Sequence, residues 1–199
     1  FIHHWRTFSS GVKTTSFFRN GSHMTSLPFI TCKNTNFSLY LCIRTTYFDN
    51  LDDMNDRISK VLTFLEVNGI EYKNHIHPPL PTIELALEYW KEIDSTHCKN
   101  LFFRNHKGNR HYLVVFECHK ELSIHTLEKS LRQGKLSFAS QERMERCLGL
   151  LPGSVSPFGL INDMNLTDAN PKELFENGHR VKLFLDQDLK IADKLSFHP

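Results

Sequence analysis

The first candidate for chemistry is a stretch rich in glycine and proline whose backbone N–H groups could bind a ligand. Residues 149–163 read GLLPGSVSPFGLIND, with three glycines and two prolines among apolar residues. Glycine permits positive φ and close approach of a ligand to the main chain, whereas proline fixes its own φ. Gly153, Pro157 and Gly159 together favour a loop held in one conformation that presents backbone N–H groups to a ligand. An ordinary long connection is the alternative that this stretch alone leaves open.

A lysine is the second candidate for chemistry. Lys99 precedes the apolar run NLFFRN, which predicts a buried strand. Its ammonium is therefore expected at a strand edge, facing either solvent or a cleft. An exposed lysine without a function is the alternative.

Metal ligation and the common catalytic motifs find little support. His75 and His77 would share one side of a strand, but no Cys, Asp or Glu stands beside them at ligand spacing, and Pro78 indicates a structural corner. The five cysteines include no CxxC pair, so they indicate neither a disulfide framework nor a zinc site, and a reducing compartment fits best. No GxSxG elbow, Walker lysine or GxGxxG turn is present.

The charges are balanced outside the first quarter of the chain. Residues 54–199 carry nineteen Lys/Arg and nineteen Asp/Glu, against five and three in residues 1–53. A neutral domain excludes a broad electrostatic binder of nucleic acid, although Arg104, Lys107 and Arg110 could contact a few phosphates or simply form a solvated hairpin tip. No apolar run is long enough to cross a bilayer, so no membrane partner is expected.

Residues 1–53 are expected to form an extension outside the core. Their first 48 residues contain no acidic side chain and show no sustained hydrophobic period. They resemble an organellar transit peptide, but GSHM at 21–24 resembles the scar of a cleaved affinity tag, which we favour for residues 1–23. We accordingly expect a cytoplasmic protein, or an organellar one if the extension is a native transit segment, with its domain at 54–199.

Hydrophobic periodicity and turn residues predict a mixed α+β domain without strict βαβ alternation. A β-hairpin that turns at Lys107 and Gly108 is predicted between two apolar strands. Helices are expected at 53–69 and 82–93, around Leu127 and Leu131 up to Gly134, at 140–149, and briefly after Pro171. Strands are expected at 70–77, 98–104, 111–117, 181–186 and within 191–199.

Four segments in unbroken order resemble a known family. They are Lys99-Asn100-Leu101-Phe102, YLVV at 112–115, LSFAS at 136–140 and LGLLPGSVSPFGLIND at 148–163. Over about residues 54–199 the chain resembles the YbaK-like aminoacyl-tRNA editing superfamily. It is most similar there to the free-standing prolyl-tRNA editing proteins of the ProXp-ala or PrdX type, and so to the insertion domain of bacterial prolyl-tRNA synthetases.

The resemblance implies a fold and an activity. The fold is a curved, barrel-like mixed sheet flanked by helices. The activity is hydrolysis of alanine wrongly esterified to proline tRNA, without a metal or an organic cofactor. The implied partners are the acceptor end of aminoacylated tRNA and prolyl-tRNA synthetase.

The resemblance also implies roles for particular residues. Gly153 to Pro157 matches a GxxxP loop that lines the aminoacyl pocket and offers backbone donors to the ester. Lys99 matches a functional lysine near the tRNA terminus, and His198 matches a histidine close to the terminal adenosine. Lys99, Gly153 and His198 form the expected catalytic set. The expected substrate-binding residues are Asn100, Ser154, Val155, Ser156, Pro157 and Phe158.

A mechanism follows from these roles. A lysine base would need a strongly lowered pKa, for which the sequence gives no evidence, so Lys99 is expected to anchor the acceptor end. The resemblance implies that the terminal ribose hydroxyl of the substrate activates the water, with His198 helping to orient it.

Two rival functions stay open. One is an editor of another small aminoacyl-tRNA, such as cysteinyl-tRNA(Pro), and the other is a non-catalytic module that binds tRNA or a partner. The neutral domain favours the module, whereas Lys99, Asn100 and the complete GxxxP loop favour an enzyme. Family members continue beyond the motif at His198 and Pro199, so a truncated C-terminus is expected.

Overall fold

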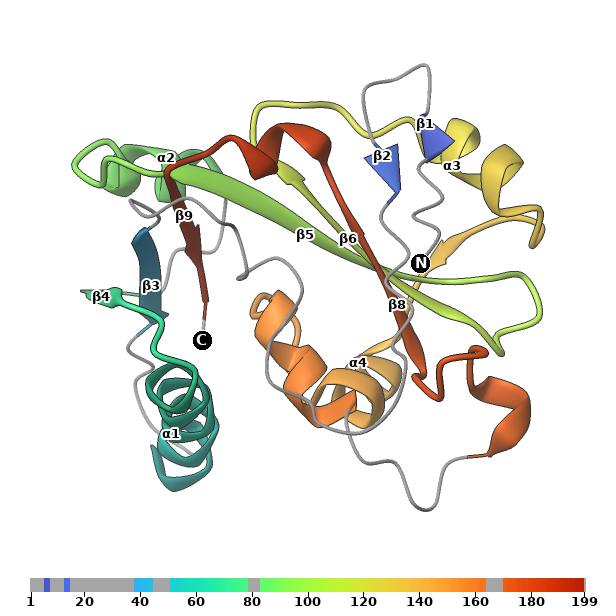
Figure 1. Cartoon of the computed structure of the whole chain (residues 1–199), viewed down its shortest axis with the longest axis horizontal. Coiled ribbons are helices and arrows are strands. Elements are labelled where there is room, and N and C mark those ends of the chain that lie inside the picture. The colour runs from blue at the N-terminus through green and yellow to red at the C-terminus, as the bar shows by residue number, and fades with distance from the viewer. Residues whose placement is uncertain are drawn as a thin grey trace. The chain divides into compact units, whose positions relative to one another are not determined.

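The computed structural model describes residues 6–7, 13–14, 38–44, 51–78, 83–163 and 170–198 (Figure 1). The chain divides into two compact units. Unit 1 comprises residues 1–23 and 98–191, and unit 2 comprises residues 24–97 and 192–199. Strand β5 (Thr96–Arg104) runs through the boundary, because its first two residues belong to unit 2.

Unit 2 is built around strand β3 (Ser38–Arg44), which pairs in parallel with β4 (Tyr72–His77) on one side and with β9 (Lys194–Phe197) on the other. Leu39 and Leu41 of β3 are fully buried. The expectation that residues 1–53 lie outside the core is therefore wrong for 38–44. A central strand flanked on both sides is buried whatever its sequence position, and the run LYLCI supplies the apolar residues that it needs.

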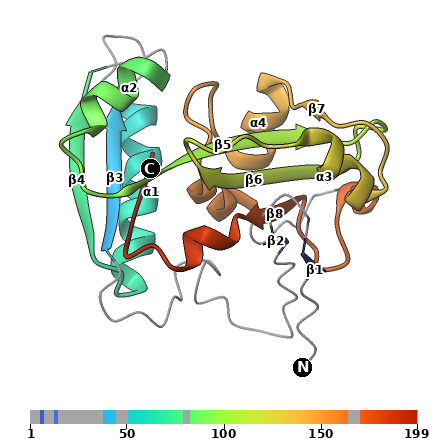
Figure 2. The ribbon, with the colours of Figure 1, turned by 90° about the horizontal axis from the view of Figure 1, so that it is seen from above.

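Two helices complete unit 2. Helix α1 (Leu51–Val67) buries Val61 and Leu65 and lies beside β3 in both views (Figures 1 and 2). It is followed, as predicted, by Gly69 at a φ of 64°. Helix α2 (Ile83–Trp90) confirms the second predicted helix, although Thr82, where that helix was expected to begin, lies outside the described residues.

Unit 1 contains the predicted hairpin. Strands β5 and β6 (His111–Glu117) pair in antiparallel register from Cys98 opposite Glu117 to Arg104 opposite His111. The tip is closed by Asn105, whose side-chain oxygen accepts hydrogen bonds from the N–H groups of residues 109 and 110. The short strand β7 (Ser137–Phe138) pairs with β5, and β8 (Val181–Leu185) pairs in parallel with β6. A further short pair joins β1 (Arg6–Thr7) and β2 (Lys13–Thr14).

The helices of unit 1 cover both faces of this hairpin sheet. Helix α3 (Ile124–Leu131) packs Leu127 against Tyr112, Val114 and Phe116, which share one face of β6 because side chains alternate along a strand. Helix α4 (Gln141–Leu148) bonds to His111, which lies on the opposite face. The 3₁₀ helix η1 (Pro157–Asp163) follows α4, and two shorter ones are η2 (Pro171–Glu173) and η3 (Gln187–Lys190).

Two predicted elements differ in extent. Helix α3 ends at Leu131 because Arg132 already adopts the left-handed conformation that stops it, at a φ of 52°. Gly134, the predicted end, also has a positive φ, of 76°, but lies beyond the helix. The predicted helix after Pro171 is only the three-residue η2, since Leu174 already has an extended backbone.

The hydrogen-bonded strand order is β4-β3-β9-β5-β6-β8, with β7 added beside β5. This seven-stranded mixed sheet with its helices confirms the predicted α+β class, while the barrel-like curvature stays a prediction. No helix among the described residues is long and apolar enough to cross a membrane.

Candidate functional site

The loop of residues 149–159 is pinned where it leaves α4. Gly149 ends α4 at a φ of 64°, and a Cβ there would lie 2.6 Å from the side-chain nitrogen of Asn162. That nitrogen donates to the carbonyl of Leu148 over 2.8 Å. Gly159 packs so closely on Leu148 that a Cβ would lie 2.8 Å from the leucine Cβ. The unusual glycine content of this stretch therefore serves the close packing of η1 on the end of α4.

Between these anchors the chain makes a tight turn. The N–H of Ser154 donates to the carbonyl of Leu151 over 3.1 Å, and Gly153 has a φ of 83°. Proline at the second position and a positive φ at the third are the features of a type II turn, which explains Pro152 followed by Gly153. The sequence-based hypothesis of a loop in one conformation fits this geometry.

The rest of the loop turns inward. Ser156 is fully buried, and its hydroxyl accepts a hydrogen bond from the N–H of Phe158, while its carbonyl accepts from Gly159. Pro157 and Phe158 are buried at the start of η1. These residues hold the loop in place, so the exposed or half-buried part of the loop that follows Pro152 is Gly153 to Val155.

Two backbone donors remain in that accessible part. In the region that the structure describes, the N–H groups of Gly153 and Val155 donate to no other group, whereas the N–H of Ser154 is used inside the turn. Two N–H groups separated by one residue on an ordered turn can bind a carbonyl oxygen or an anion.

Asn100 lies on the face of the hairpin sheet that α4 contacts. It is paired with Val115, so it shares a face with His111 and hence with α4. Its side-chain Oδ1 is buried and has no hydrogen-bond partner among the described residues. A buried acceptor without a donor costs roughly 1–3 kcal/mol, so this oxygen is suited to a donor that a ligand brings.

Lys99 leaves the strand on the opposite face. It is paired with Phe116, which packs against α3, and its charge acts on the thiol of Cys118. Neighbouring residues on a strand point to opposite sides, so the register separates the Cβ atoms of Lys99 and Asn100. Lys99 and Asn100 form one motif in the sequence. Only the strand register shows that their side chains leave the sheet on opposite faces.

His198 belongs to unit 2, so its place in a site with the loop stays a prediction. Within unit 2 its Nδ1 donates to the carbonyl of Cys42 over 2.7 Å, which leaves Nε2 as the unprotonated nitrogen of the neutral ring. The ring centroid of His198 lies 5.7 Å from that of His77. The other histidine considered as a ligand, His75, stacks on Tyr40.

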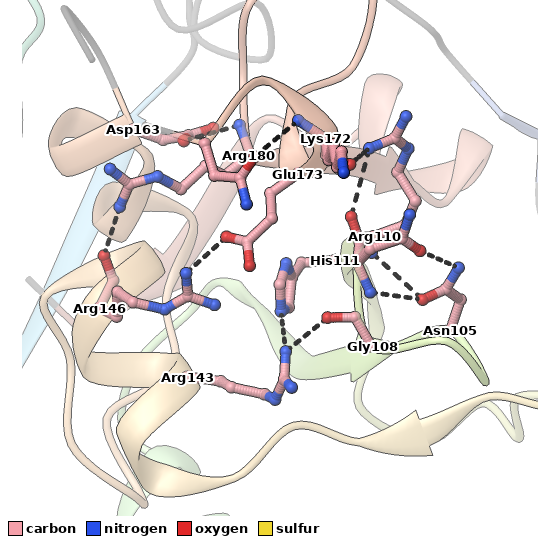
Figure 3. A network of polar contacts seen from close by, with 12 residues as sticks. Asn105, Gly108, Arg110, His111, Arg143, Arg146, Asp163, Lys172, Glu173 and Arg180 are labelled. Carbon is pink, nitrogen blue, oxygen red and sulfur yellow. Dashed lines mark hydrogen bonds and ion pairs between the residues drawn. The ribbon is translucent and has the colours of Figure 1, made fainter. Parts of the chain in front are cut away.

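The structure adds a polar network that the sequence did not predict (Figure 3). The guanidinium of Arg143 on α4 donates to the carbonyl of Gly108, over 2.7 Å, and to Nε2 of His111, over 3.0 Å. Arg146 pairs with Glu173 at 2.5 Å. The contacts join α4 to the hairpin tip and to η2, and so fix the helix from which the loop departs.

Burial determines the charge state within this network. Burial first, and then the positive charge of Arg143, lowers the pKa of His111 to about 4. The imidazole is therefore neutral at physiological pH and accepts the bond from Arg143. The sequence did not single out this histidine, because a lone His before the apolar run YLVV gives no sign of its arginine partner.

Asp163 anchors the far end of η1. Its buried carboxylate accepts hydrogen bonds from the N–H groups of Arg180 and Val181, over 2.9 and 3.0 Å, at the start of β8.

One of the basic residues at the hairpin tip also stabilises the fold, since Arg110 donates to the carbonyl of Lys172 over 2.7 Å.

Comparison with known proteins identifies the family. The model of the aminoacyl-tRNA editing domain matches residues 77–199, which is more than half of the chain. The chain therefore belongs to this family, and the resemblance that its motifs suggested is confirmed.

Individual relatives agree with this assignment. The Prolyl-tRNA editing protein ProX of Acetoanaerobium sticklandii is 39% identical over 108 residues, which cover 54% of this chain and 66% of that protein. The putative prolyl-tRNA synthetase associated domain-containing protein 1 of Homo sapiens is 28% identical over 127 residues, covering 62% and 67%. Its counterpart in Mus musculus is 26% identical over 126 residues, with the same coverage. The chain thus spans just under two thirds of the bacterial relative.

Proposed function

We propose that this member of the aminoacyl-tRNA editing family deacylates mischarged tRNA(Pro), and that alanyl-tRNA(Pro) is its substrate. The observation that carries the proposal is the ordered turn at Gly153. The backbone N–H groups of Gly153 and Val155 are available there to a ligand. The names of the relatives support tRNA(Pro) as the nucleic acid, and those of the mammalian ones support an association with prolyl-tRNA synthetase.

The proposed reaction needs few catalytic groups. An aminoacyl ester is already activated, so the main requirement is to stabilise the oxyanion that forms when water attacks its carbonyl. The N–H groups of Gly153 and Val155 bind that oxygen, and one such donor contributes on the order of 3 kcal/mol in other hydrolases. The 2′- or 3′-hydroxyl of the terminal ribose activates the water.

Asn100 binds the other end of the aminoacyl group. Its buried Oδ1 accepts a hydrogen bond from the α-ammonium of the substrate, which satisfies an acceptor that has no donor among the described residues. Lys99 anchors the acceptor end by charge, and His198 orients the attacked ester. These two roles rest on the family resemblance and are tested separately from the loop.

Selection by size explains why such an editor is needed. A synthetase pocket made for proline excludes the smaller alanine weakly, because missing methylenes change binding by only about 1–3 kcal/mol. A narrower second site hydrolyses alanine and rejects proline by steric overlap. Val155, half-buried beside the donors, and the buried Phe158 are the apolar residues proposed to set that size.

The test compares deacylation of alanyl-, cysteinyl-, seryl- and prolyl-tRNA(Pro) by the parent protein and by Asn100→Ala. We expect alanyl-tRNA(Pro) to be hydrolysed fastest and prolyl-tRNA(Pro) to be spared, with a loss of more than about tenfold in Asn100→Ala. The exposed Asn74→Ala serves as the matched control and keeps full activity.

Other outcomes of this assay identify the rivals. Faster hydrolysis of the cysteinyl ester would replace alanine by cysteine as the substrate. Tight binding of tRNA(Pro) without hydrolysis of any ester would reject the enzyme and leave a non-catalytic binding module.

A further inference from the structure

Three consecutive residues at the end of β6 bring a carboxylate, a thiol and an imidazole together. Oε1 of Glu117 lies 2.6 Å from Nδ1 of His119, and Sγ of Cys118 lies 3.3 Å from each of these atoms. None of the three residues has a role in the proposed deacylation. We propose that Glu117, Cys118 and His119 form a binding site for a divalent metal ion of the zinc type.

The types and spacing of these donors match zinc. Zinc takes sulfur at about 2.3 Å and nitrogen or oxygen at about 2.0–2.2 Å, so tetrahedral geometry places its ligand atoms roughly 3.3–3.5 Å apart. The two distances from Cys118 already lie at that value. The shorter separation between Glu117 and His119 has to open by somewhat under 1 Å.

The three side chains differ in freedom in a way that suits binding. Cys118 is buried and fixes the sulfur, whereas the side chain of His119 is 71% exposed and can turn to admit the ion. The backbone N–H of His119 donates to both carboxylate oxygens of Glu117, over 3.0 Å each, and so holds that carboxylate at the site. Solvent supplies the fourth ligand on the exposed side.

The thiol of Cys118 must lose its proton before it can bind a metal ion. Burial first, and then Glu117, raises the pKa of Cys118 to about 11, so the thiol is protonated before the metal arrives. Binding exchanges that proton for the metal ion and releases it to the buffer. The carboxylate of Glu117 supplies one negative charge and the new thiolate a second, which together neutralise a divalent ion.

Sequence patterns did not predict this cluster. Metal sites are sought as separated pairs such as CxxC, whereas adjacent residues of an extended strand point in opposite directions. Here the strand ends at Glu117 and the chain turns through Cys118 and His119, which lets three successive side chains meet. Deacylation as proposed needs no metal and uses none of these three side chains, although the charge of Lys99 acts on the Cys118 thiol.

Cobalt(II) titration of the full chain tests the proposal, because a cobalt–thiolate bond gives a charge-transfer absorption that histidines elsewhere in the chain cannot produce. We expect one equivalent of cobalt to give this band and one equivalent of zinc to abolish it. Cys118→Ser should remove the band. Cys147→Ser, which changes a buried cysteine of α4 outside the cluster, should retain it.

His119→Ala gives a second test that does not disturb the core, because the side chain is largely exposed. Loss of a ligand should weaken zinc binding, as measured by calorimetry, by more than the roughly 10–100-fold that follows loss of a residue that only hydrogen-bonds to a ligand. The absence of a thiolate band in the parent protein, or a band that persists in Cys118→Ser, would overturn the proposal. Neither result depends on whether the protein deacylates tRNA.

Discussion

Lys99 and Asn100 are neighbours on β5 whose side chains leave the strand on opposite faces. This separation gives them different tasks in the proposed reaction. Asn100 presents a buried oxygen without a hydrogen-bond partner among the described residues on the face that α4 contacts, which suits a small polar group. Lys99 offers a mobile charge on a four-carbon stem, which suits the phosphates of an acceptor end better than a fixed hydrogen bond.

Replacement of Lys99 tests its proposed role. Lys99→Ala should lower single-turnover deacylation of alanyl-tRNA(Pro) by about 100-fold, because small misplacements of the ester are costly, whereas a chelator should leave the rate unchanged. Lys99→Arg keeps the charge, so partial recovery supports electrostatic anchoring, and no recovery supports a tight pocket or proton transfer. Equal rates for Lys99→Ala and the parent protein would show that the lysine has no part in the reaction.

His111 makes the stability of the fold depend on pH. Its folded pKa of about 4 lies below the value of about 6.5 for an unfolded chain. Between these values the unfolded state binds a proton that the folded state does not. The contribution of the neutral His111 to the unfolding free energy is therefore fully present above about pH 6.5 and is lost as pH falls toward about 4. At pH 5 the unfolding free energy is lower by roughly 2 kcal/mol.

Urea unfolding at pH 7 and pH 5 measures this effect. In His111→Gln the difference in unfolding free energy between the two pH values should shrink by roughly 2 kcal/mol relative to the parent protein. His106→Gln changes an exposed histidine of the hairpin tip and should keep the parent's pH dependence. An unaltered pH dependence in His111→Gln would contradict burial of a neutral imidazole.

The loop between α4 and η1 shows how an element can be rigid without regular structure. Its ends are held by Gly149 with Asn162 and by Gly159 with Leu148, and its middle is a turn whose glycine has a positive φ. Such a turn keeps its N–H groups in place before the substrate arrives, which is the condition under which backbone donors stabilise an oxyanion.

Gly153→Val tests the turn. A β-branched residue at a φ of 83° is strained by about 1–2 kcal/mol or more, so the turn should rearrange, and deacylation should fall by more than about 100-fold while the domain stays folded. Gly178→Val is the matched control, since its φ is 79° and a Cβ there meets nothing within 4 Å. We expect the control to lose some stability but no activity. Unchanged turnover in Gly153→Val would remove the loop from the mechanism.

Strand β3 supports the core of unit 2 from within the segment that the sequence assigned to an extension. Leu41→Ala removes a fully buried side chain and should lower the unfolding free energy by about 2–5 kcal/mol in thermal or urea unfolding. Val67→Ala at the exposed end of α1 should stay within about 0.5 kcal/mol of the parent protein. A similarly small effect of Leu41→Ala would show that the extension contributes nothing to the core.

At the scale of the whole molecule, local signals predicted local structure. The hairpin, the ends of α1 and α4, and strand β8 follow from periodicity and from glycines that must adopt positive φ. Strand β3 was missed because its apolar run lies in a region whose composition resembles a leader. Its burial depends on β4 and β9, which reach it from distant parts of the chain.

The candidate site shows the same division. The loop and Lys99-Asn100 could be found from sequence because their residue types are unusual or match a family. The bond between Arg143 and His111, the inward turn of Ser156 and the cluster at Cys118 could not. Each depends on which side chains the fold places within about 3 Å, and no spacing along the chain encodes that distance.

The charge balance of the whole domain leads to a prediction about tRNA binding. Nineteen basic and nineteen acidic residues in 54–199 leave no net positive charge, so we expect few phosphates to be neutralised. The logarithm of the affinity for tRNA(Pro) should fall with the logarithm of salt concentration with a slope of about −2 to −3, as for two to four contacts. Fluorescence titrations between about 50 and 200 mM salt measure this slope.

Lys99→Ala should make the slope shallower by about 1, because one phosphate contact is lost. Lys107→Ala, at the exposed hairpin tip, should leave the slope unchanged if that tip is only solvated. A slope of about −6 or steeper would show that a local basic surface, and not the single lysine, dominates recognition.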